Sequence, residues 1–186
     1  MKHVAQLKAL LTHDPARMKI LRMARDLNLP DCWIAAGFVR SLVWDHLHQR
    51  KPSALPDDID VIWFDPARAN TETDSALVRK LSSRCSEVNW SVKNQARMHL
   101  RNADTPYQST TDAMICWPET ATAVAVRLDH HGEVEVSAPL GLEDLFSGVV
   151  RPTDRFKSEK YPLFLDRIRS KAWREIWPEL IFVTQR

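Results

Sequence analysis

The 186-residue chain contains only four glycines and three cysteines, and it has no long apolar runs. Cys32, Cys85 and Cys116 are widely spaced and odd in number, which excludes a disulfide framework and the usual zinc-binding spacings. No run approaches the roughly 18 apolar residues of a membrane span, and the N-terminus has no apolar run followed by a cleavage signal. The sequence therefore predicts a reduced, cytoplasmic, soluble protein without a membrane partner.

The chain also lacks an excess of either charge. Its 26 Lys and Arg residues and 24 Asp and Glu residues give a formal net charge of only +2. That value is too small to indicate a nucleic-acid binder unless the basic residues gather on one face. Hydrophobic residues make up 44% of the chain and charged residues 27%, which is ordinary for a globular protein. The length suits one domain with a short helical appendage.

The apolar periodicity alternates between helical and extended stretches. Short apolar or alternating runs bounded by turn residues predict strands, and apolar residues spaced by three or four predict helices. The order of elements, with a hairpin late in the chain, favours an α+β fold with a mixed sheet. The expected helices cover 4–11, 15–29, 39–47, 76–81 and 161–177, and the expected strands cover 32–35, 58–64, 88–92, 120–128 and 133–136.

Two aspartates, Asp58 and Asp60, begin one of these predicted strands. Side chains alternate along a strand, so the two carboxylates share one face, about 6.6 Å apart along the chain. Such a pair suits Mg²⁺ or Mn²⁺, which takes one or two carboxylates together with phosphates and water. Isolated Asp-x-Asp pairs more often end a loop and face water. Here the following strand is apolar on both faces, which makes Asp60 an unusual structural choice and favours a metal site.

A glycine joins an earlier predicted strand to a helix. Gly37 follows a short apolar run and precedes Phe38, and Arg40 comes one turn into the helix. A helix start offers unpaired N–H groups to a phosphate, and a glycine lets the backbone approach a ligand closely. Arg40 adds a forked cationic donor. The alternative is that Gly37 makes only a tight turn and Arg40 lies on the surface.

Taken together, the strand, Gly37, the helix containing Val39-Arg40 and the strand Asp58-Ile59-Asp60 resemble the nucleotidyltransferase superfamily of polymerase beta and the CCA-adding enzymes. The resemblance implies that the turn at Gly37, Phe38 and Arg40 binds nucleotide phosphates. It also implies that Asp58 and Asp60 are catalytic residues that bind divalent metal.

The match departs from the superfamily pattern at three positions of the turn. Ala36 stands where the first glycine is usual, Phe38 replaces a small residue found in polymerase-like members, and Ser41 replaces an aspartate.

A narrower resemblance covers nearly the whole chain. Residues 90–99, 118–124 and 138–146, with the basic, tryptophan-containing stretch at 171–178, are similar to a bacterial nucleotidyltransferase-like family, formerly described as a domain of unknown function. The resemblance implies a nucleotidyltransferase-fold domain with N-terminal helices over residues 1–150, and a helical extension over 151–186 packed on the same domain. It does not imply a substrate.

Superfamily enzymes place a third carboxylate on a neighbouring strand, as a metal ligand or base. The predicted strand at 88–92 contains no acid, and Glu87 at its edge is the first candidate. Asp104, Asp112 and Glu119 lie further on and are alternatives. The lack of an obvious third acid keeps a non-catalytic interpretation open.

Polar residues follow the same strand, at Lys93, Asn94 and Arg97. They are candidates for holding the triphosphate or the base. An equally good interpretation is that Asn94 caps the next helix and that the two cations face water. The basic residues of the last helix have two interpretations as well: they grip RNA, or they lie in water while Trp173 and Trp177 pack inward.

The sequence thus predicts a metal-dependent nucleotidyltransferase that moves a nucleoside monophosphate from a nucleoside triphosphate to a hydroxyl. The acceptor is left open between RNA, a protein and a small molecule. A catalytically silent nucleotide-binding or regulatory module on the same fold is the alternative. A metal-dependent phosphohydrolase is a third hypothesis, but it does not explain the turn at Gly37.

Overall fold

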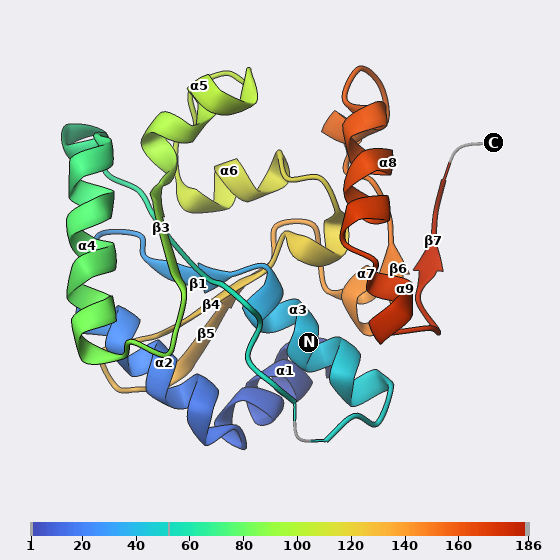
Figure 1. Cartoon of the computed structure of the whole chain (residues 1–186), viewed down its shortest axis with the longest axis horizontal. Helices are drawn as coiled ribbons and strands as arrows, with labels where there is room; N and C mark the ends of the chain where they lie inside the picture. The colour runs from blue at the N-terminus through green and yellow to red at the C-terminus, as the bar shows by residue number, and fades with distance from the viewer. Residues whose placement is uncertain (1, 52, 185–186) are drawn as a thin grey trace.

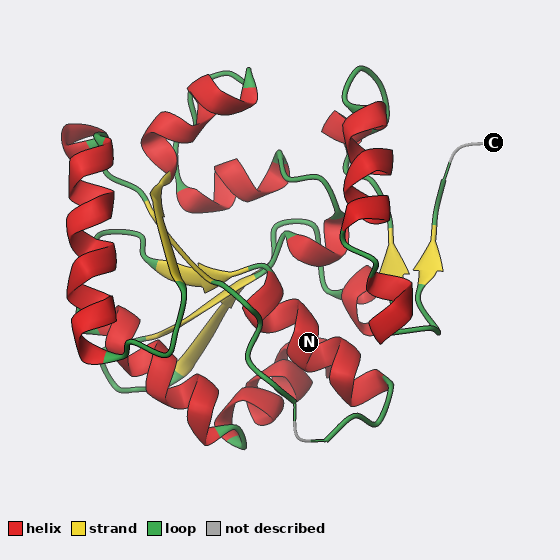
Figure 2. Ribbon diagram, viewed as in Figure 1, coloured by secondary structure: helices red, strands yellow, loops and turns green. Residues whose placement is uncertain are grey.

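The computed structural model describes residues 2–51 and 53–184. Helices surround a five-stranded sheet, and a two-stranded sheet lies apart from it (Figure 1, Figure 2). The helices of four or more residues are α1 (Lys2–Thr12), α2 (Pro15–Arg25), α3 (Gly37–Leu47), α4 (Thr71–Arg84), α5 (Met98–Asn102), α6 (Thr110–Ile115), α7 (Glu143–Phe146), α8 (Tyr161–Ser170) and α9 (Trp173–Ile176). The strands are β1 (Trp33–Ala35), β2 (Ile59–Trp63), β3 (Trp90–Asn94), β4 (Ala125–Leu128), β5 (Val134–Ser137), β6 (Val149–Val150) and β7 (Ile181–Phe182).

The large sheet has the strand order β3-β2-β1-β4-β5. Only the β2–β3 pair is parallel, because α4 carries the chain back between them, and the other three pairs are antiparallel. The expected α+β fold with a mixed sheet is confirmed. In the register, Asp60 lies between Ala35 of β1 and Ser91 of β3, so it is held between two neighbouring strands.

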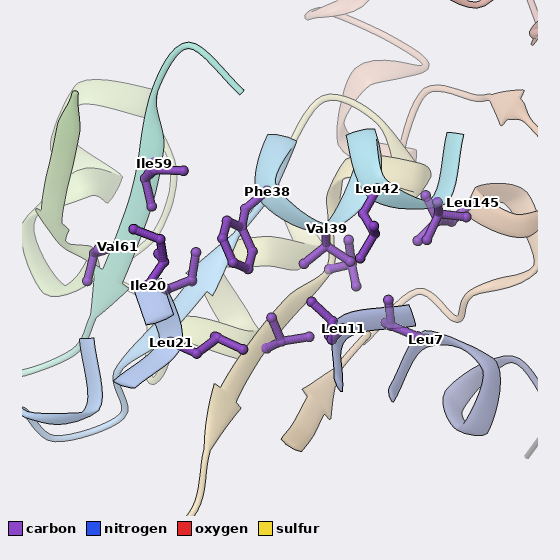
Figure 3. Close-up of a cluster of buried hydrophobic side chains, with 14 of the residues drawn as sticks. Leu7, Leu11, Ile20, Leu21, Phe38, Val39, Leu42, Ile59, Val61 and Leu145 are labelled. Atoms are coloured by element: carbon purple, nitrogen blue, oxygen red, sulfur yellow. The ribbon is translucent and has the colours of Figure 1, made fainter. Parts of the chain in front are cut away.

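The main core lies between one face of this sheet and the helices α1 to α4 (Figure 3). Helix α2 begins as the sequence predicts, since the Asp14 side chain accepts a hydrogen bond from the Arg17 amide and Pro15 occupies the first turn. Ile59 and Val61 of β2 point into this core. By strand alternation, Asp60 and Ile62 point to the opposite face.

The opposite face carries several alanines, together with the larger Trp33 and Ile62. Ala35, Ala36, Ala123 and Ala125 form a second cluster there with the α6 residue Met114. Small side chains leave room above the sheet. Figure 1 shows α5 and α6 on this side, away from α1 and α2.

Three tryptophans pack the C-terminal helix α9 against α3. Trp44 contacts Trp173 and Trp177 edge-on, with ring centroids 5.3 and 5.2 Å apart. The Trp177 indole also donates a hydrogen bond to Asp45 at 2.8 Å. The inward packing expected for Trp173 and Trp177 is observed, since both are buried. Downstream, β7 pairs with β6.

Several predicted elements differ from the structure: α2 ends at Arg25 and not at 29, α4 is longer than the expected 76–81, and two further elements are divided. The strand expected from residue 120 begins only at Ala125, because the amides of Thr122 and Ala123 bond to the Glu119 carbonyl and form a 3₁₀ turn. The single helix expected over 161–177 is broken at Ala172, which takes a left-handed conformation (φ 47°). The break redirects the chain so that Trp173 and Trp177 reach Trp44.

The hairpin expected around residues 129–132 is present. Asp129 accepts hydrogen bonds from the His131 and Glu133 amides, and Gly132 has the positive φ (85°) that the turn requires. Within the described residues, each helix is too short or too polar to cross a bilayer.

Candidate functional site

A cavity of about 730 Å³ lies where β1 turns into α3 and the chain enters β2. Gly37 and Arg40 reach it from α3, Asp58 and Asp60 from β2 and its approach, and Arg167 from α8. The structure thus brings together four of the residues singled out from the sequence. For the basic residues of 161–177, among them Arg167, contact with RNA and a position in water were both left open, and nothing in the helical spacing indicates that α8 folds back over the sheet.

The turn into α3 is unusual at Ala36. Its backbone has φ 54° and ψ −118°, a region that residues with a side chain rarely adopt. The amides of Val39 and Arg40 bond to the Ala36 carbonyl, so the first amides of the helix, at Gly37 and Phe38, have no intrahelical acceptor. A Cβ on Gly37 would lie 3.6 Å from Pro56 and from the Arg40 guanidinium, within the space at the cavity wall. That distance is an ordinary van der Waals contact, so neither packing nor backbone conformation requires a glycine at this position.

Arg40 is a buried cation without an ion-pair partner among the described residues. Its side chain donates to the Thr122 hydroxyl at 3.3 Å, and its Nε has no hydrogen-bond partner there. The guanidinium lies over the Trp173 and Trp44 rings, 4.5 and 5.1 Å from their centroids. Burial lowers the pKa of Arg40 to about 10, although the nearby Glu119 charge acts in the opposite direction. A buried guanidinium with a vacant donor is a site for an anion.

Asp58 and Asp60 repel one another within this cavity. The pKa of Asp60 is raised, first by burial and then by the Asp58 charge, while a hydrogen bond from Ser91 and the charge of Arg40 act against the shift. Two carboxylates in this position fit a divalent cation, because a cation removes the repulsion and phosphate and water complete its ligands. Among residues 2–51 and 53–184, no three His, Cys, Asp or Glu side chains form a metal-binding cluster.

Glu119, which is buried, and Arg167, which is half-buried, form an ion pair beside Arg40. The Arg167 Nε lies 2.6 Å from Glu119 Oε1, and Glu119 is completely buried. Its second oxygen, Oε2, has no hydrogen-bond partner within the described structure. The pair therefore holds a cation at the cavity wall and a carboxylate behind it.

The other candidates for a third acid are engaged elsewhere. Glu87 is exposed, accepts a hydrogen bond from the Cys85 thiol, and does not line the cavity. Asp104 is ion-paired with Arg155 and Lys160.

Asp112 is engaged locally as well, because it accepts a hydrogen bond from the Gln108 amide and does not line the cavity. None of the four candidates joins Asp58 and Asp60 in the cavity.

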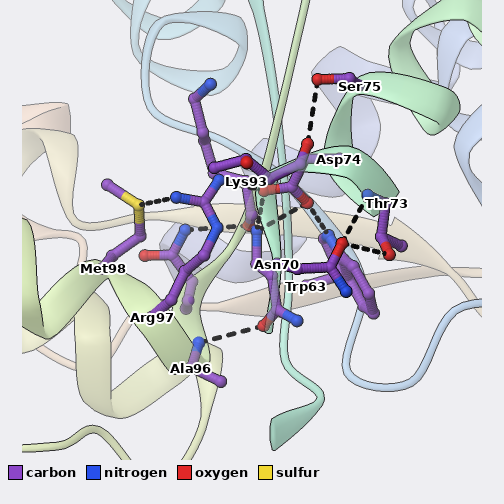
Figure 4. A network of polar contacts seen from close by, with 12 residues as sticks. Trp63, Asn70, Thr73, Asp74, Ser75, Lys93, Ala96, Arg97 and Met98 are labelled. Atoms are coloured by element: carbon purple, nitrogen blue, oxygen red, sulfur yellow. Dashed lines mark hydrogen bonds and ion pairs between the residues drawn. The ribbon is translucent and has the colours of Figure 1, made fainter. Parts of the chain in front are cut away.

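Asn94 and Arg97 belong to a structural network at the far end of β2 (Figure 4). Asn94 is buried and accepts a hydrogen bond from the Ala96 amide, so it caps the following turn. Arg97 is ion-paired with buried Asp74, which also accepts a hydrogen bond from the Trp63 indole. Asn94 and Arg97 are therefore engaged within the fold and do not line the cavity that contains Asp58 and Asp60.

The two remaining nucleotide-binding candidates are placed differently. Lys93 reaches a second cavity that also contains Asp60. The Phe38 side chain is in the core, with the Arg17 guanidinium 5.6 Å from its ring centroid, so only its backbone amide is available to a ligand.

Comparison with known families and structures gives one sequence match that spans most of the chain. Residues 22–182 match the family model described as nucleotidyltransferase. The chain belongs to the nucleotidyltransferase family. One similar solved structure was determined by NMR and is described as revealing a CCA-adding enzyme head domain. It is 37% identical in sequence, with a TM-score of 0.85, and the match covers 97% of this chain and 96% of that one. A search of the curated proteins finds no match.

More distant structures share the fold alone. A CCA-adding enzyme in complex with CTP is 14% identical with a TM-score of 0.61, and the match covers 96% of this chain but 43% of that one. The Thermotoga maritima CCA-adding enzyme in complex with tRNA is 15% identical, again with a TM-score of 0.61, and 42% of that chain is covered. This nucleotidyltransferase spans less than half the length of those two enzymes.

Proposed function

We propose that this nucleotidyltransferase is an active, metal-dependent enzyme that moves a nucleoside monophosphate from a nucleoside triphosphate to a hydroxyl acceptor. One observation carries the proposal: the unpaired buried guanidinium of Arg40 and the carboxylates of Asp58 and Asp60 line the same cavity. An anion-binding group beside a cation-binding pair is what a metal-bound polyphosphate requires.

The residues divide the binding between them. The amides of Gly37 and Phe38 and the guanidinium of Arg40 hold the phosphates. Asp58 and Asp60 hold Mg²⁺ or Mn²⁺, which when bound neutralises charge on the phosphates. Burial first, and then the Asp58 charge, raise the pKa of Asp60, and because a cation relieves the repulsion between the carboxylates, the site's affinity for it depends on both aspartates.

In the reaction, the acceptor oxygen forms a bond to the α-phosphorus. The bond from that phosphorus to the oxygen bridging to the β-phosphate breaks, pyrophosphate leaves with the electron pair, and the hydroxyl proton passes to water. Arg40 and Arg167 lie beside the cavity and stabilise the negative charge that moves onto the leaving group.

A silent nucleotide-binding module is the second candidate. It is favoured by the absence of a third carboxylate next to Asp58 and Asp60 among the described residues. The two candidates agree on binding and differ only in whether label is transferred.

The test combines label transfer with thermal unfolding. The solved relatives include complexes with CTP, ATP and tRNA, so we would incubate the protein with α-labelled CTP or ATP, Mg²⁺ or Mn²⁺, and RNA, protein or small-molecule acceptors. The wild type is expected to transfer label, and its Tm is expected to rise on adding Mg²⁺ with triphosphate, by the linkage RT ln(1 + [L]/Kd).

The double variant Asp58→Asn/Asp60→Asn is expected to lose both responses while it remains folded. The matched control is Asp154→Asn, which removes an exposed carboxylate outside the cavity and is expected to behave as the wild type. Binding without transfer would identify the silent module. An equal nucleotide response in the wild type and the double variant would show that the site lies elsewhere.

A further inference from the structure

A second cavity, of about 410 Å³, opens on the other side of Asp60, between α5 and α8. It shares Ala36, Asp60 and Arg167 with the first cavity. A ligand in each would therefore meet at Asp60, which is where the α-phosphate and the attacking hydroxyl must meet during transfer.

The floor of this cavity is apolar and partly aromatic. Trp117, half-buried after α6, and Phe156 lie beside Met98 of α5 and Leu163 of α8. Leu163 is 59% exposed and gives the cavity an open apolar edge. The half-buried Trp117 ring is a platform on which a flat ring stacks, whereas the Phe156 ring is buried.

The rim of the cavity is cationic. Lys93, Arg101, Lys160 and Arg167 surround it, and Asp60 is its one acidic lining residue. Lys160 is held by Asp104 at 2.8 Å, and Arg167 is held by Glu119. Lys93 and Arg101 have no ion-pair partner in the described part of the chain, so their charges are available to a ligand.

We propose that the second cavity is the acceptor site and that it binds one nucleotide unit. Its ring stacks on Trp117, its phosphate lies between Lys93 and Arg101, and its free hydroxyl points to Asp60. The cavity falls within the range of about 300–1,000 Å³ typical of ligand pockets. A serine or threonine hydroxyl brings neither a flat ring nor a phosphate, and a tyrosine brings a ring but no phosphate, so a protein acceptor leaves the cationic rim unused. This inference rests on the proposed function, because it names the acceptor for the same transfer.

A nucleotide unit has two sources, the 3′ end of an RNA strand or a free nucleotide. The test therefore uses both, without metal or triphosphate. An eight-nucleotide RNA with a 3′-terminal 4-thiouridine is photocrosslinked to the full chain and the crosslinked residue is identified by mass spectrometry. Uridine monophosphate is the competitor, and a parallel titration follows anisotropy of a 5′-labelled copy of the RNA.

The crosslink is expected at Trp117 or another residue of the second cavity. Arg101→Ala is expected to weaken binding about five- to tenfold, and Trp117→Leu at least about fivefold through lost stacking. Arg79→Ala, an exposed arginine on α4 outside both cavities, is the matched control and is expected to bind as the wild type. Because Trp117 packs against the alanine cluster, thermal unfolding of each variant is measured alongside.

If the RNA binds and the free nucleotide competes only at millimolar concentration, the site is assigned to an RNA end. Tight binding of the nucleotide with weak binding of RNA would assign it to a free nucleotide, and the site stands. A crosslink outside the cavity, or an Arg101→Ala variant that binds as well as the wild type, would overturn the proposal, as would labelling of a protein acceptor alone.

Failure of the proposed function has a different signature. The Asp58→Asn/Asp60→Asn variant would then match the wild type in its response to Mg²⁺ and triphosphate, whatever the crosslink shows.

Discussion

Charged groups lie near both ends of β2, and they are partnered in opposite ways. At the far end, Asp74 accepts hydrogen bonds from the Trp63 indole and the Asn94 amide and is ion-paired with Arg97 (Figure 4). At the near end, Asp60 lies beside a second carboxylate, and the neighbouring Arg40 has an unpartnered donor among the described groups.

This difference in hydrogen bonding and ion pairing indicates which charged groups serve the fold and which are left to bind a ligand. A buried polar group that is fully paired contributes to the fold, whereas one left unpaired costs stability and persists where a ligand completes it. The same strand therefore holds a structural site at one end and a binding site at the other, only a few residues apart.

The sharpest test of the comparison removes the paired charge. Asp74→Ala removes the ion-pair partner of the Arg97 guanidinium and leaves the Trp63 and Asn94 donors without an acceptor. We expect a loss of about 3–5 kcal/mol in the free energy of unfolding, measured by urea denaturation. Glu72→Ala, an exposed acid in the same helical turn, is the control and should change stability by no more than about 0.5 kcal/mol. A loss below about 1 kcal/mol for Asp74→Ala would remove the contrast between the two ends.

A second paired carboxylate extends the comparison to acid pH. Burial tends to raise the pKa of Asp104, but hydrogen bonds from Lys160, Tyr107 and Arg155 outweigh it, so its pKa is lowered. A lowered carboxyl pKa stabilises the fold above the unfolded value near 4, and the contribution is lost as the pH falls through the folded value. We expect Asp104→Asn to cost about 1–2 kcal/mol at pH 7 and almost nothing at the acid end of the range. Equal stability differences at both pH values would contradict the assignment.

At the Asp60 end of β2, replacing the carboxylate by an amide should change the stability with the opposite sign. Because the pKa of Asp60 is raised, its ionisation destabilises the fold without ligand, and the penalty grows as the pH rises through the raised pKa. Asp60→Asn should therefore stabilise the protein, by about 1 kcal/mol at pH 7. The gain should vanish below about pH 4, where both forms are neutral. Thermal unfolding at several pH values measures it, and a destabilised variant would make Asp60 a structural residue.

The smallest effect is expected at Ala36, where the chain departs from the superfamily's first glycine. Ala36→Gly relieves the strained backbone (φ 54°, ψ −118°) but adds freedom to the unfolded chain. The net gain expected is about 0.5 kcal/mol, from strain of roughly 1–3 kcal/mol against roughly 0.4–1 kcal/mol of entropy. Ala35→Gly, in the neighbouring strand, should destabilise instead. A loss at Ala36 as well would mean that its methyl group packs more than its strain costs.

Most of the fold could be predicted from local patterns. The strand with Asp60, the hairpin at Asp129 and the helix start at Asp14 each depend on neighbouring residues, and each is present. The break at Ala172 could not be predicted, because it depends on where Trp44 lies.

The candidate site could be predicted only in part, for the same reason. The spacing of Asp58 and Asp60 is local, so the pair was found from the sequence. The pairing of Glu119 with Arg167, 48 residues apart, depends on α8 folding back over the sheet. The pairing of Arg97 with Asp74 likewise turns an expected ligand contact into a structural one.

The tryptophan cluster between α3 and α9 has a practical consequence. Trp44 and Trp173 face the Arg40 guanidinium, and Trp173 and Trp177 line the first cavity. Indole emission responds to the electric field of nearby charges, so an anion that arrives at Arg40 changes the light that these rings emit. The protein therefore contains an intrinsic optical reporter of its own occupancy, and ligand binding is readable without a label.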